Sequence, residues 1–251
     1  MNVIINGILG RMGRAISNRI IQDGKHSLLG GVDPNFSSTV FPFTVVKNLA
    51  ELIEPETVVI DFSLPEGTSH VLAIWDEIKF PMIIGTTGLS SDEIDRIREC
   101  SKEVPVVHAN NFSIGVTLLQ DFVRYMTSKM KDLDYDIEII EGHHRFKKDA
   151  PSGTARTLLD TIQAQFDHRR EEIYGRKGVS DSRDNQIGIH SIRGGGIIGK
   201  HEVHYIGKAE SLSISHEAFS REVFVDGVIL ALDRIGQLKP GYYTMSDLLD
   251  L

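Results

Sequence analysis

The chain has 251 residues, 41% hydrophobic and 25% charged, and this composition is typical of a folded globular protein. Its formal net charge of −8 disfavours nucleic acid as a partner, and no run approaches the roughly 18 apolar residues of a membrane helix. The single cysteine, Cys100, excludes an internal disulfide, and the start "MNVIINGILGRMG" lacks the features of a secretory signal, so we expect a cytoplasmic protein.

The first half of the chain alternates short apolar runs with segments of helical periodicity. The segment "RMGRAISNRIIQDG" has the apolar spacing of a helix that ends at a glycine. Predicted strands surround it: "NVIING", "HSLLGGVD", "TVVIDFS", "FPMIIGTTG" and "VPVVHANNFS". Strands that alternate with helices form a parallel sheet with helices on both faces. The sequence therefore predicts a Rossmann-like, doubly wound α/β domain.

The pattern changes after about Ser113 and predicts a second, α+β domain. An alternating strand, "DYDIEIIE", lies between two predicted helices, "GVTLLQDFVRYMTSKMKDL" and "GTARTLLDTIQAQF". Short strands punctuated by glycines follow from residue 187 and indicate a mostly open, mixed sheet, and "REVFVDGVILALDRIGQ" is a last helix. Residues 167–186 are polar and aperiodic, so we expect them to form an exposed mobile loop.

Three glycines, Gly7, Gly10 and Gly13, follow the first predicted strand and open the first predicted helix. Glycines at such a turn let the backbone approach a pyrophosphate, which is held at the positive end of the helix. The spacing of these glycines is one residue longer than in the usual dinucleotide fingerprint, which weakens the assignment. Asp33 supports it, because this residue ends the second strand 20 residues after Gly13, where it can accept hydrogen bonds from ribose hydroxyls. The alternative is that the glycines only tighten the turn.

The identity of the dinucleotide depends on the surroundings of Asp33. Its carboxylate would repel a 2′-phosphate, and Pro34 follows it where an arginine could have balanced the charge. NADH is therefore favoured, whereas Arg11 or Arg14 could still permit NADPH. Ligands of doubly wound sheets lie outside the carboxyl ends of the strands. The residues there are predicted to line the nicotinamide half: Phe62, Ser63, Gly85 and Thr87.

The segment "EGHHRFKKDAPSGTA" gathers two histidines, an arginine and two lysines in an otherwise acidic chain. Lys147 and the histidines supply positive charge, and the following helix start can present backbone N–H groups and hydroxyls to an anion, through Ser152, Gly153 and Thr154. A solvated charge cluster and a zinc site are the alternatives; adjacent histidines on a strand point to opposite faces, which disfavours zinc. A loop that binds carboxylates or phosphate and donates a proton explains the mixture of histidine and lysine.

The same segment resembles the signature loop of the 4-hydroxy-tetrahydrodipicolinate (dihydrodipicolinate) reductase family. The resemblance runs the length of the chain, through "GILGRMGR", "DFSLPEG", "GTTGL", "ANNFSIGV", "SIRGGGIIGKHEV", "ISHEAFSREVFVDGV" and "MSDLLDL". It implies NAD(P)H-dependent reduction of a small cyclic dicarboxylate in lysine and diaminopimelate synthesis. It also implies a dinucleotide domain of residues 1–113 and 222–251, a substrate domain of residues 114–221, and a homotetramer built through the second sheet.

The resemblance further assigns roles to individual residues. His143 is similar to the general acid of the family, and Lys147 to the lysine that shares in proton transfer and binds the substrate. The substrate carboxylates would be held by His144, Lys147, Ser152, Gly153 and Thr154. The cofactor would contact Gly7, Arg11, Met12, Asp33, Gly85, Thr87, the segment from Ala109 through Asn110 to Phe112, and Arg221 and Phe224. No metal is implied.

Two departures from the family pattern, and two other classes of protein, bear on this assignment. Phe146 stands where many members have histidine, so a third imidazole is not required or its role is lost; Pro34 stands where some have arginine, which weakens the case for NADPH. A semialdehyde dehydrogenase would need a nucleophilic cysteine, but Cys100 lies in a polar predicted helix. A non-catalytic NAD(H) sensor would not need the cationic loop.

Overall fold

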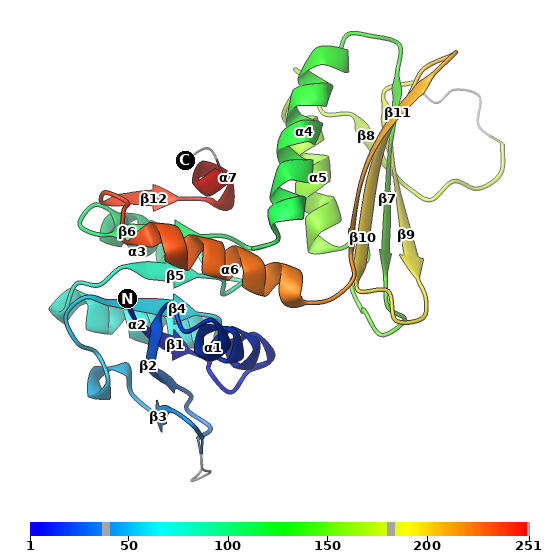
Figure 1. The fold of residues 1–251 in the computed structure, drawn as a ribbon. Coiled ribbons are helices and arrows are strands. Elements are labelled where there is room, and N and C mark those ends of the chain that lie inside the picture. Colours follow the sequence, from blue (N-terminus) through cyan, green and yellow to red (C-terminus); the bar gives the residue numbers. More distant parts are fainter. Residues whose placement is uncertain (37–40, 180–183, 250–251) are drawn as a thin grey trace. The chain divides into compact units, whose positions relative to one another are not determined.

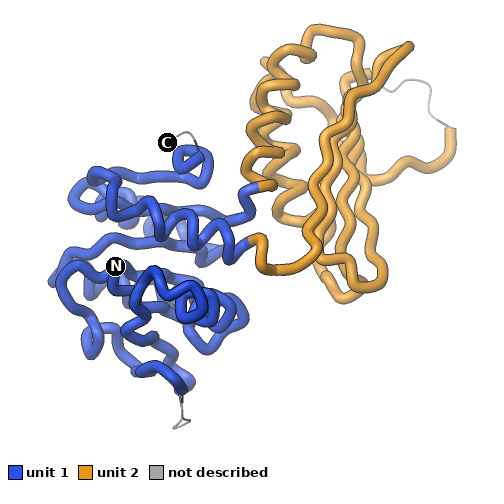
Figure 2. Tube along the Cα trace, in the orientation of Figure 1, with its two compact units in different colours: residues 1–114, 224–251 blue, residues 115–223 orange. Residues whose placement is uncertain are grey.

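The structure, a computed structural model, describes residues 1–36, 41–179 and 184–249. The chain forms two compact units, Met1–Ile114 with Phe224–Leu251 and Gly115–Val223 (Figure 2). None of the described helices is long and apolar enough to cross a membrane.

The first unit is built on a seven-stranded sheet in which every neighbouring pair of strands is parallel. The strands are β1 (Asn2–Asn6), β2 (Ser27–Val32), β3 (Thr44–Val46), β4 (Thr57–Asp61), β5 (Met82–Ile84), β6 (Pro105–His108) and β12 (Gly241–Tyr243). Their order is β12-β6-β5-β4-β1-β2-β3, so the direction of winding reverses between β1 and β4. This topology confirms the predicted Rossmann-like, doubly wound sheet, and its switch point is where such sheets bind ligands.

Helices cover both faces of this sheet (Figure 1). Since successive strand residues point to opposite faces, Val3 and Ile5 pack with α1 (Arg11–Asp23) and α6 (Glu222–Ile235), whereas Ile4 packs with α2 (Pro65–Glu77) and α3 (Ser91–Ser101). Cys100 is buried in the second of these clusters. The remaining elements of the unit are the short helices η1 (Leu49–Glu51) and α7 (Met245–Leu249).

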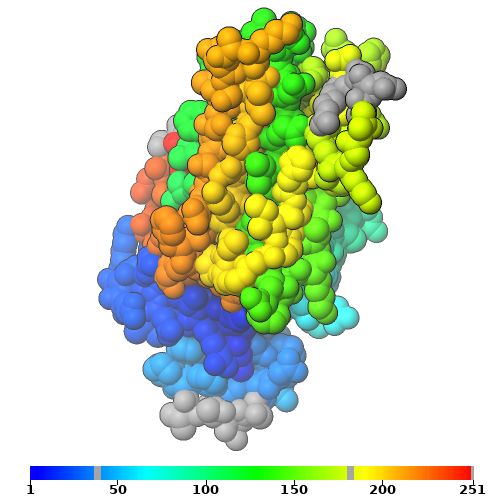
Figure 3. Space-filling model, turned by 90° about the vertical axis from the view of Figure 1, so that its right-hand side faces the viewer, coloured from blue at the N-terminus to red at the C-terminus, as the bar shows by residue number. Residues whose placement is uncertain are grey.

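The second unit has a mixed five-stranded sheet in the order β11-β10-β7-β9-β8. The strands are β7 (Asp136–His143), β8 (Glu171–Tyr174), β9 (Gln186–Arg193), β10 (Gly199–Ile206) and β11 (Ser211–Ala218). β10 is antiparallel to β7 and β11, whereas β9 is parallel to β7 and β8. Two helices, α4 (Ile114–Met130) and α5 (Gly153–Gln163), cover one face and enclose a separate apolar core. The opposite face is seen in Figure 3.

The predicted loop over residues 167–186 is wrong in part. Glu171–Tyr174 form β8, the edge strand that pairs with β9, while residues 180–183 lie outside the described residues. Three of the four β8 side chains are polar. An edge strand forms backbone hydrogen bonds with one neighbour and does not bury a full face, so its sequence need not alternate between apolar and polar residues. The three-residue strands β3 and β12 are likewise too short to produce a recognisable pattern.

Candidate active site

The glycine turn between β1 and α1 has the geometry that a pyrophosphate requires. Gly7 has a φ of 78°, and a Cβ there would lie 2.7 Å from the carbonyl oxygen of Phe62. A Cβ on Gly13 would lie 2.3 Å from the carbonyl oxygen of Gly7, so both positions exclude a side chain. Gly10 is the N-cap of α1 and brings no side chain to cap it, which leaves the helix start to an external anion. These residues fit a nicotinamide dinucleotide.

Asp33 follows β2 directly and is 8% exposed. Its Oδ1 accepts a hydrogen bond from the backbone N–H of Asn35 at 3.0 Å, which fixes the carboxylate beside the glycine turn, since the N–H of Gly7 donates to the carbonyl of Val32. Arg14 donates through Nε to the carbonyl of Leu9. Two other predicted contacts begin α1: Arg11 is exposed and Met12 is half-buried.

A buried carboxylate that the sequence reasoning missed lies at the switch point. Asp61, at the end of β4, is 1% exposed and accepts hydrogen bonds from Asn6 Nδ2 (2.9 Å), Ser63 Oγ (2.6 Å) and Thr68 Oγ1 (2.6 Å). Burial raises the pKa of this carboxyl group, and the hydrogen bonds oppose that shift. Asn6 and Asp61 are partners in the β1–β4 register, so their position at two adjacent strand ends was the available signal. The cluster ties the turn at Ser63 to the glycine turn.

Most of the other predicted cofactor contacts follow the ends of β4, β5 and β6, which are neighbours in the sheet, whereas Arg221 and Phe224 lie around the start of α6. A Cβ on Gly85 would lie 2.3 Å from the Phe62 ring, whose centroid is 5.3 Å from that of Phe112. Phe112 is 2% exposed as a whole residue and packs in the apolar core, so the free protein does not present this predicted contact to a ligand. Of the remainder, Thr87, Asn110 and Arg221 are exposed, and Ala109 and Phe224 are half-buried.

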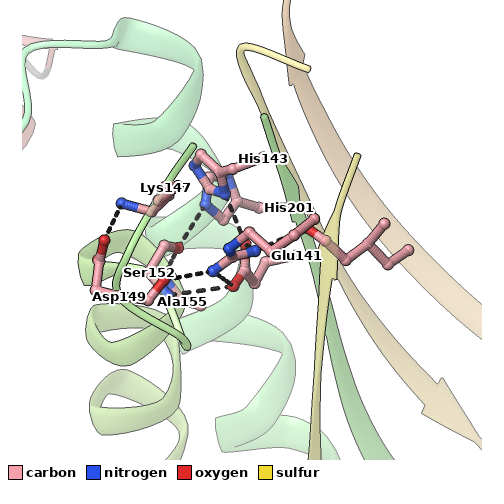
Figure 4. Close-up of polar contacts among 9 residues, drawn as sticks. Glu141, His143, Lys147, Asp149, Ser152, Ala155 and His201 are labelled. Atoms are coloured by element: carbon pink, nitrogen blue, oxygen red, sulfur yellow. Dashed lines mark hydrogen bonds and ion pairs between the residues drawn. The ribbon is translucent and has the colours of Figure 1, made fainter. Parts of the chain in front are cut away.

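The cationic loop follows β7, whose last residue is His143 (Figure 4). His143 Nδ1 lies 2.6 Å from Oε2 of Glu141, which is fully buried. Arg193, the last residue of β9, donates to both Glu141 oxygens, at 2.9 Å and 2.6 Å. Although burial alone would raise it, hydrogen bonds from Arg193, Ser191 and His143 lower the pKa of Glu141 to about 2. The carboxylate is therefore ionised at neutral pH.

The electrostatics around His143 favour its neutral form in the free protein. Burial is the main cause that lowers its pKa; Glu141 acts in the opposite direction, and the charges of Lys147 and Arg193 lower it further. Lys147 Nζ forms an ion pair at 2.9 Å with Asp149, whose side chain is 58% exposed. An incoming anion could therefore replace Asp149 at the ammonium group with little rearrangement.

The predicted carboxylate-binding residues at the start of α5 are of two kinds, one buried and the others accessible. Ser152 is 2% exposed; its Oγ accepts from the N–H of Ala155 at 3.2 Å, and its own N–H donates to Glu141 Oε1 at 3.2 Å. Its role in the free protein is to fix the helix to β7. Gly153 is exposed and has open space around its Cα, whereas Thr154 and His144 are half-buried. The accessible part of the helix start is thus formed by Gly153 and Thr154.

Three residues of this cluster were not predicted, namely Glu141, Arg193 and His201. His201 on β10 is 4% exposed, its Nε2 lies 3.2 Å from Ser152 Oγ, and its ring centroid is 5.2 Å from that of His143. Burial, with a further contribution from His143, lowers its pKa to about 4. In the sheet, His201 is the register partner of Glu141, and Arg193 that of His143. Polar residues at both ends of "SIRGGGIIGKH" were the only sequence signal.

An open cavity of about 620 Å³ lies beside the same loop but does not include His143 or Lys147. Its lining includes Pro151, Arg156, Tyr174 and His190. Arg156 donates to Tyr174, and His190 Nε2 lies 2.6 Å from Glu138 Oε2, so these polar groups are already engaged within the protein. The cluster around Glu141, and not this cavity, carries the groups suited to proton transfer.

Comparisons with known proteins agree over both units. Residues 1–112 match the sequence model "Dihydrodipicolinate reductase, N-terminus", and residues 115–249 match "Dihydrodipicolinate reductase, C-terminus". The 4-hydroxy-tetrahydrodipicolinate reductase of Methanocorpusculum labreanum is 40% identical over 255 residues, covering 100% of each chain. That of Caldanaerobacter subterraneus subsp. tengcongensis is 40% identical over 249 residues, covering 99% of this chain and 98% of the other.

Solved structures show the same fold. A dipicolinate-bound dihydrodipicolinate reductase from Paenisporosarcina sp. TG-14 has a TM-score of 0.80 at 24% identity, and 97% of each chain is covered. An aspartate dehydrogenase from Thermotoga maritima has a TM-score of 0.53 at 14% identity, covering 93% of this chain and 96% of the other. The fold is therefore retained in a solved structure of only 14% sequence identity.

Proposed function

Since this chain belongs to the dihydrodipicolinate reductase family, we propose that its cationic loop binds a small cyclic dicarboxylate and protonates it during reduction. The chain is an NAD(P)H-dependent oxidoreductase, and its reaction is the reduction of 4-hydroxy-tetrahydrodipicolinate in lysine and diaminopimelate biosynthesis. One observation carries the proposal for the loop: the buried carboxylate of Glu141 holds both His143 and the start of α5, so a proton donor and an anion-binding helix start are fixed to one group.

Binding would depend on charge and on exposed N–H groups. Lys147 would exchange its ion pair with Asp149 for one substrate carboxylate, with His144 beside it. The exposed start of α5 at Gly153 and Thr154 would receive the other, because the first N–H groups of a helix have no acceptor within the helix and favour anions. Ser152, as the buried N-cap, would act mainly by holding this helix start in place.

Proton transfer is assigned to His143, assisted by Lys147. A neutral His143 whose Nδ1–H donates to Glu141 leaves Nε2 as the nitrogen that takes up and delivers the proton. A dianionic substrate nearby would raise the pKa of His143 and charge it before the reaction. The nicotinamide cofactor would supply the hydride and Nε2 the proton, and the reduction balances overall with loss of the 4-hydroxyl group of the substrate as water. General acid catalysis of this kind contributes roughly 10²–10⁴-fold.

The finer assignments are part of the same proposal. NADH is favoured over NADPH, since the fixed carboxylate of Asp33 would repel a 2′-phosphate.

The first unit would be the dinucleotide domain and the second the substrate domain, in a cytoplasmic homotetramer assembled through the outer sheet face. On that face Ile192 and Ile206 are 53% and 39% exposed. Light scattering of the purified protein tests the assembly, with four times 28.0 kDa expected, and parallel kinetics with NADH and NADPH test the cofactor.

The test of function follows the absorbance of reduced nicotinamide after 4-hydroxy-tetrahydrodipicolinate and NADH are supplied. Lys147→Ala should lower kcat and raise KM for the dicarboxylate while leaving NADH affinity unchanged, because Lys147 and the glycine turn belong to different units. Its exposed neighbour provides the matched control, and Lys148→Ala should retain both constants. Wild-type protein that binds NADH but never oxidises it would favour a sensor, and unchanged kinetics in Lys147→Ala would remove the lysine from the mechanism.

A further inference from the structure

No described hydrogen bond joins Arg193 to His143, but both residues bind the same carboxylate, that of Glu141. Its two terminal nitrogens donate to the two oxygens of Glu141, and one of those oxygens also contacts His143 Nδ1. A further bond from Arg193 reaches the carbonyl of Asp149, at 2.7 Å, so the guanidinium group also holds the loop that carries Lys147. The Arg193 side chain is 19% exposed, and Glu141 is fully buried. The fork is therefore screened from most solvent.

A buried carboxylate beside a histidine has two opposing consequences for an acid catalyst. It fixes the tautomer and the ring, as a positioning group should. Its negative charge also favours the imidazolium form, which makes the imidazolium a weaker acid, and it would repel a dianionic substrate. A second, positive group bound to the same carboxylate preserves the positioning and cancels most of the charge. Arg193 occupies that place.

Of the other groups that face His143, Lys147 also lowers the pKa of that residue, but neither Lys147 nor His201 forms a described hydrogen bond with Glu141. Lys147, in the loop, is already paired with Asp149. His201, on β10, is buried and packs with its ring tilted by 71° against that of His143. Glu141 is the only carboxylate among the described residues that contacts the His143 side chain through a hydrogen bond. Among the described residues, Arg193 is thus the positive group that is hydrogen-bonded to the same carboxylate as His143.

We propose that Arg193 is a positioning residue that, through Glu141, holds the His143 ring and keeps it a strong enough acid to protonate the substrate. The inference rests on the proposed function in assigning the proton to His143, but its electrostatic part concerns the free protein alone. It requires that removal of Arg193 and removal of the Glu141 charge move the titration of His143 in opposite directions. Damage to the fold alone would not produce shifts of opposite sign.

The experiment titrates His143 by nitrogen-15 NMR of the imidazole ring in the full-length protein. The signals are assigned by comparison with His143→Gln, since the chain has ten histidines. In Arg193→Met the His143 titration should move to higher pH, because the guanidinium group that balances the charge of Glu141 is gone. In Glu141→Gln it should move to lower pH, because the positive charges of Lys147 and Arg193 remain.

The outer face of the same sheet offers a matched control. There Arg176 and His190 both contact Glu138, as Arg193 and His143 both contact Glu141. Arg176→Met is thus the same substitution in a similar trio, and it should leave the His143 titration unchanged. Arg193→Lys covers the case in which Arg193→Met does not fold. Lysine keeps the charge but cannot form the fork, so the upward shift should be smaller yet present.

Steady-state kinetics connect the titration to catalysis. Because the protonated form of His143 is the acid, kcat/KM falls above its pKa, and this alkaline limb should follow the NMR shift in each variant. Arg193→Met should also show a lower kcat, since a raised pKa makes a weaker acid. Titrations that stay at the wild-type position in Arg193→Met and Arg193→Lys overturn the inference. Shifts of the expected sign in a protein that never turns over the substrate instead overturn the proposed function.

Discussion

The low pKa of His201 predicts that the second unit loses stability in mild acid. Folding buries this histidine and lowers its pKa from 6.5 to about 4. The unfolded chain therefore binds this proton at a higher pH than the folded chain does. The stabilisation is fully present above pH 6.5, and it is lost as the pH falls through that value toward about 4.

The size of the effect follows from the width of that window. A difference of about 2.5 pH units, at about 1.4 kcal/mol per unit, amounts to about 3.5 kcal/mol of unfolding free energy, of which about 3 kcal/mol is lost by pH 4. Domains of this size are stable by roughly 5–15 kcal/mol in total, so the loss is readily measured. Glu141, the other strongly shifted group of the cluster, has a pKa of about 2 and contributes to acid sensitivity only below about pH 4.5.

The assay is urea unfolding of wild type and His201→Gln at several values between pH 7.5 and 4, followed by circular dichroism and by tryptophan fluorescence. Trp75 is the single tryptophan and lies in α2, so its fluorescence reports the first unit and serves as an internal control. In the variant, the free energy of the second unit should fall about 3 kcal/mol less between pH 6.5 and 4. His70→Gln, on the exposed surface of α2, should follow the wild-type curve. Parallel curves for wild type and His201→Gln would refute the reasoning.

Two further predictions concern hydroxyl groups and a glycine near the proposed ligand sites. Thr68→Val removes a hydrogen bond to the buried carboxylate of Asp61 and should destabilise the first unit by about 1–3 kcal/mol in urea unfolding monitored by Trp75. Thr57 is fully buried and its Oγ1 has no partner among the described residues, so Thr57→Val should be neutral or stabilising; equal losses in both variants would contradict this account. Gly153→Ala meets open space at a helix start and should leave thermal stability unchanged or slightly higher. It should nonetheless raise KM for the dicarboxylate several-fold if the carboxylate approaches this backbone, and an unchanged KM would exclude that approach.

Local patterns were sufficient to predict the glycine turn, because its causes lie within a few residues of each other. Gly13 must lack a Cβ to pass the carbonyl of Gly7, and Asp33 follows the strand beside that turn. The same holds for the long helices and the alternating strand β7. The parallel, doubly wound character of the sheet followed from strand–helix alternation, whereas the order of its strands is known only from the structure.

The network around Glu141 could not be predicted in the same way. Its members come from β7, β9 and β10, and they meet only because the register of these strands sets Arg193 beside His143 and His201 beside Glu141. A shift of one residue would send each side chain to the other face of the sheet. Periodicity in a single sequence identifies a strand but does not reveal its partner. The edge strand β8 was missed for the complementary reason, since it lacks a buried face.

The position of α6 has a consequence for the order in which the chain can acquire its structure during synthesis. Five residues of α6 complete the apolar layer over β1 and β4: Val225, Val228, Ala231, Leu232 and Ile235. More than a hundred residues, which form the whole second unit, separate β6 from that helix. The glycine turn therefore leaves the ribosome long before α6, which completes the apolar layer over the sheet, has been synthesised. The inserted unit, whose sequence is continuous, can fold before α6 of the surrounding unit has been synthesised, and nascent chains arrested before residue 222 should be protease-sensitive in their first hundred residues.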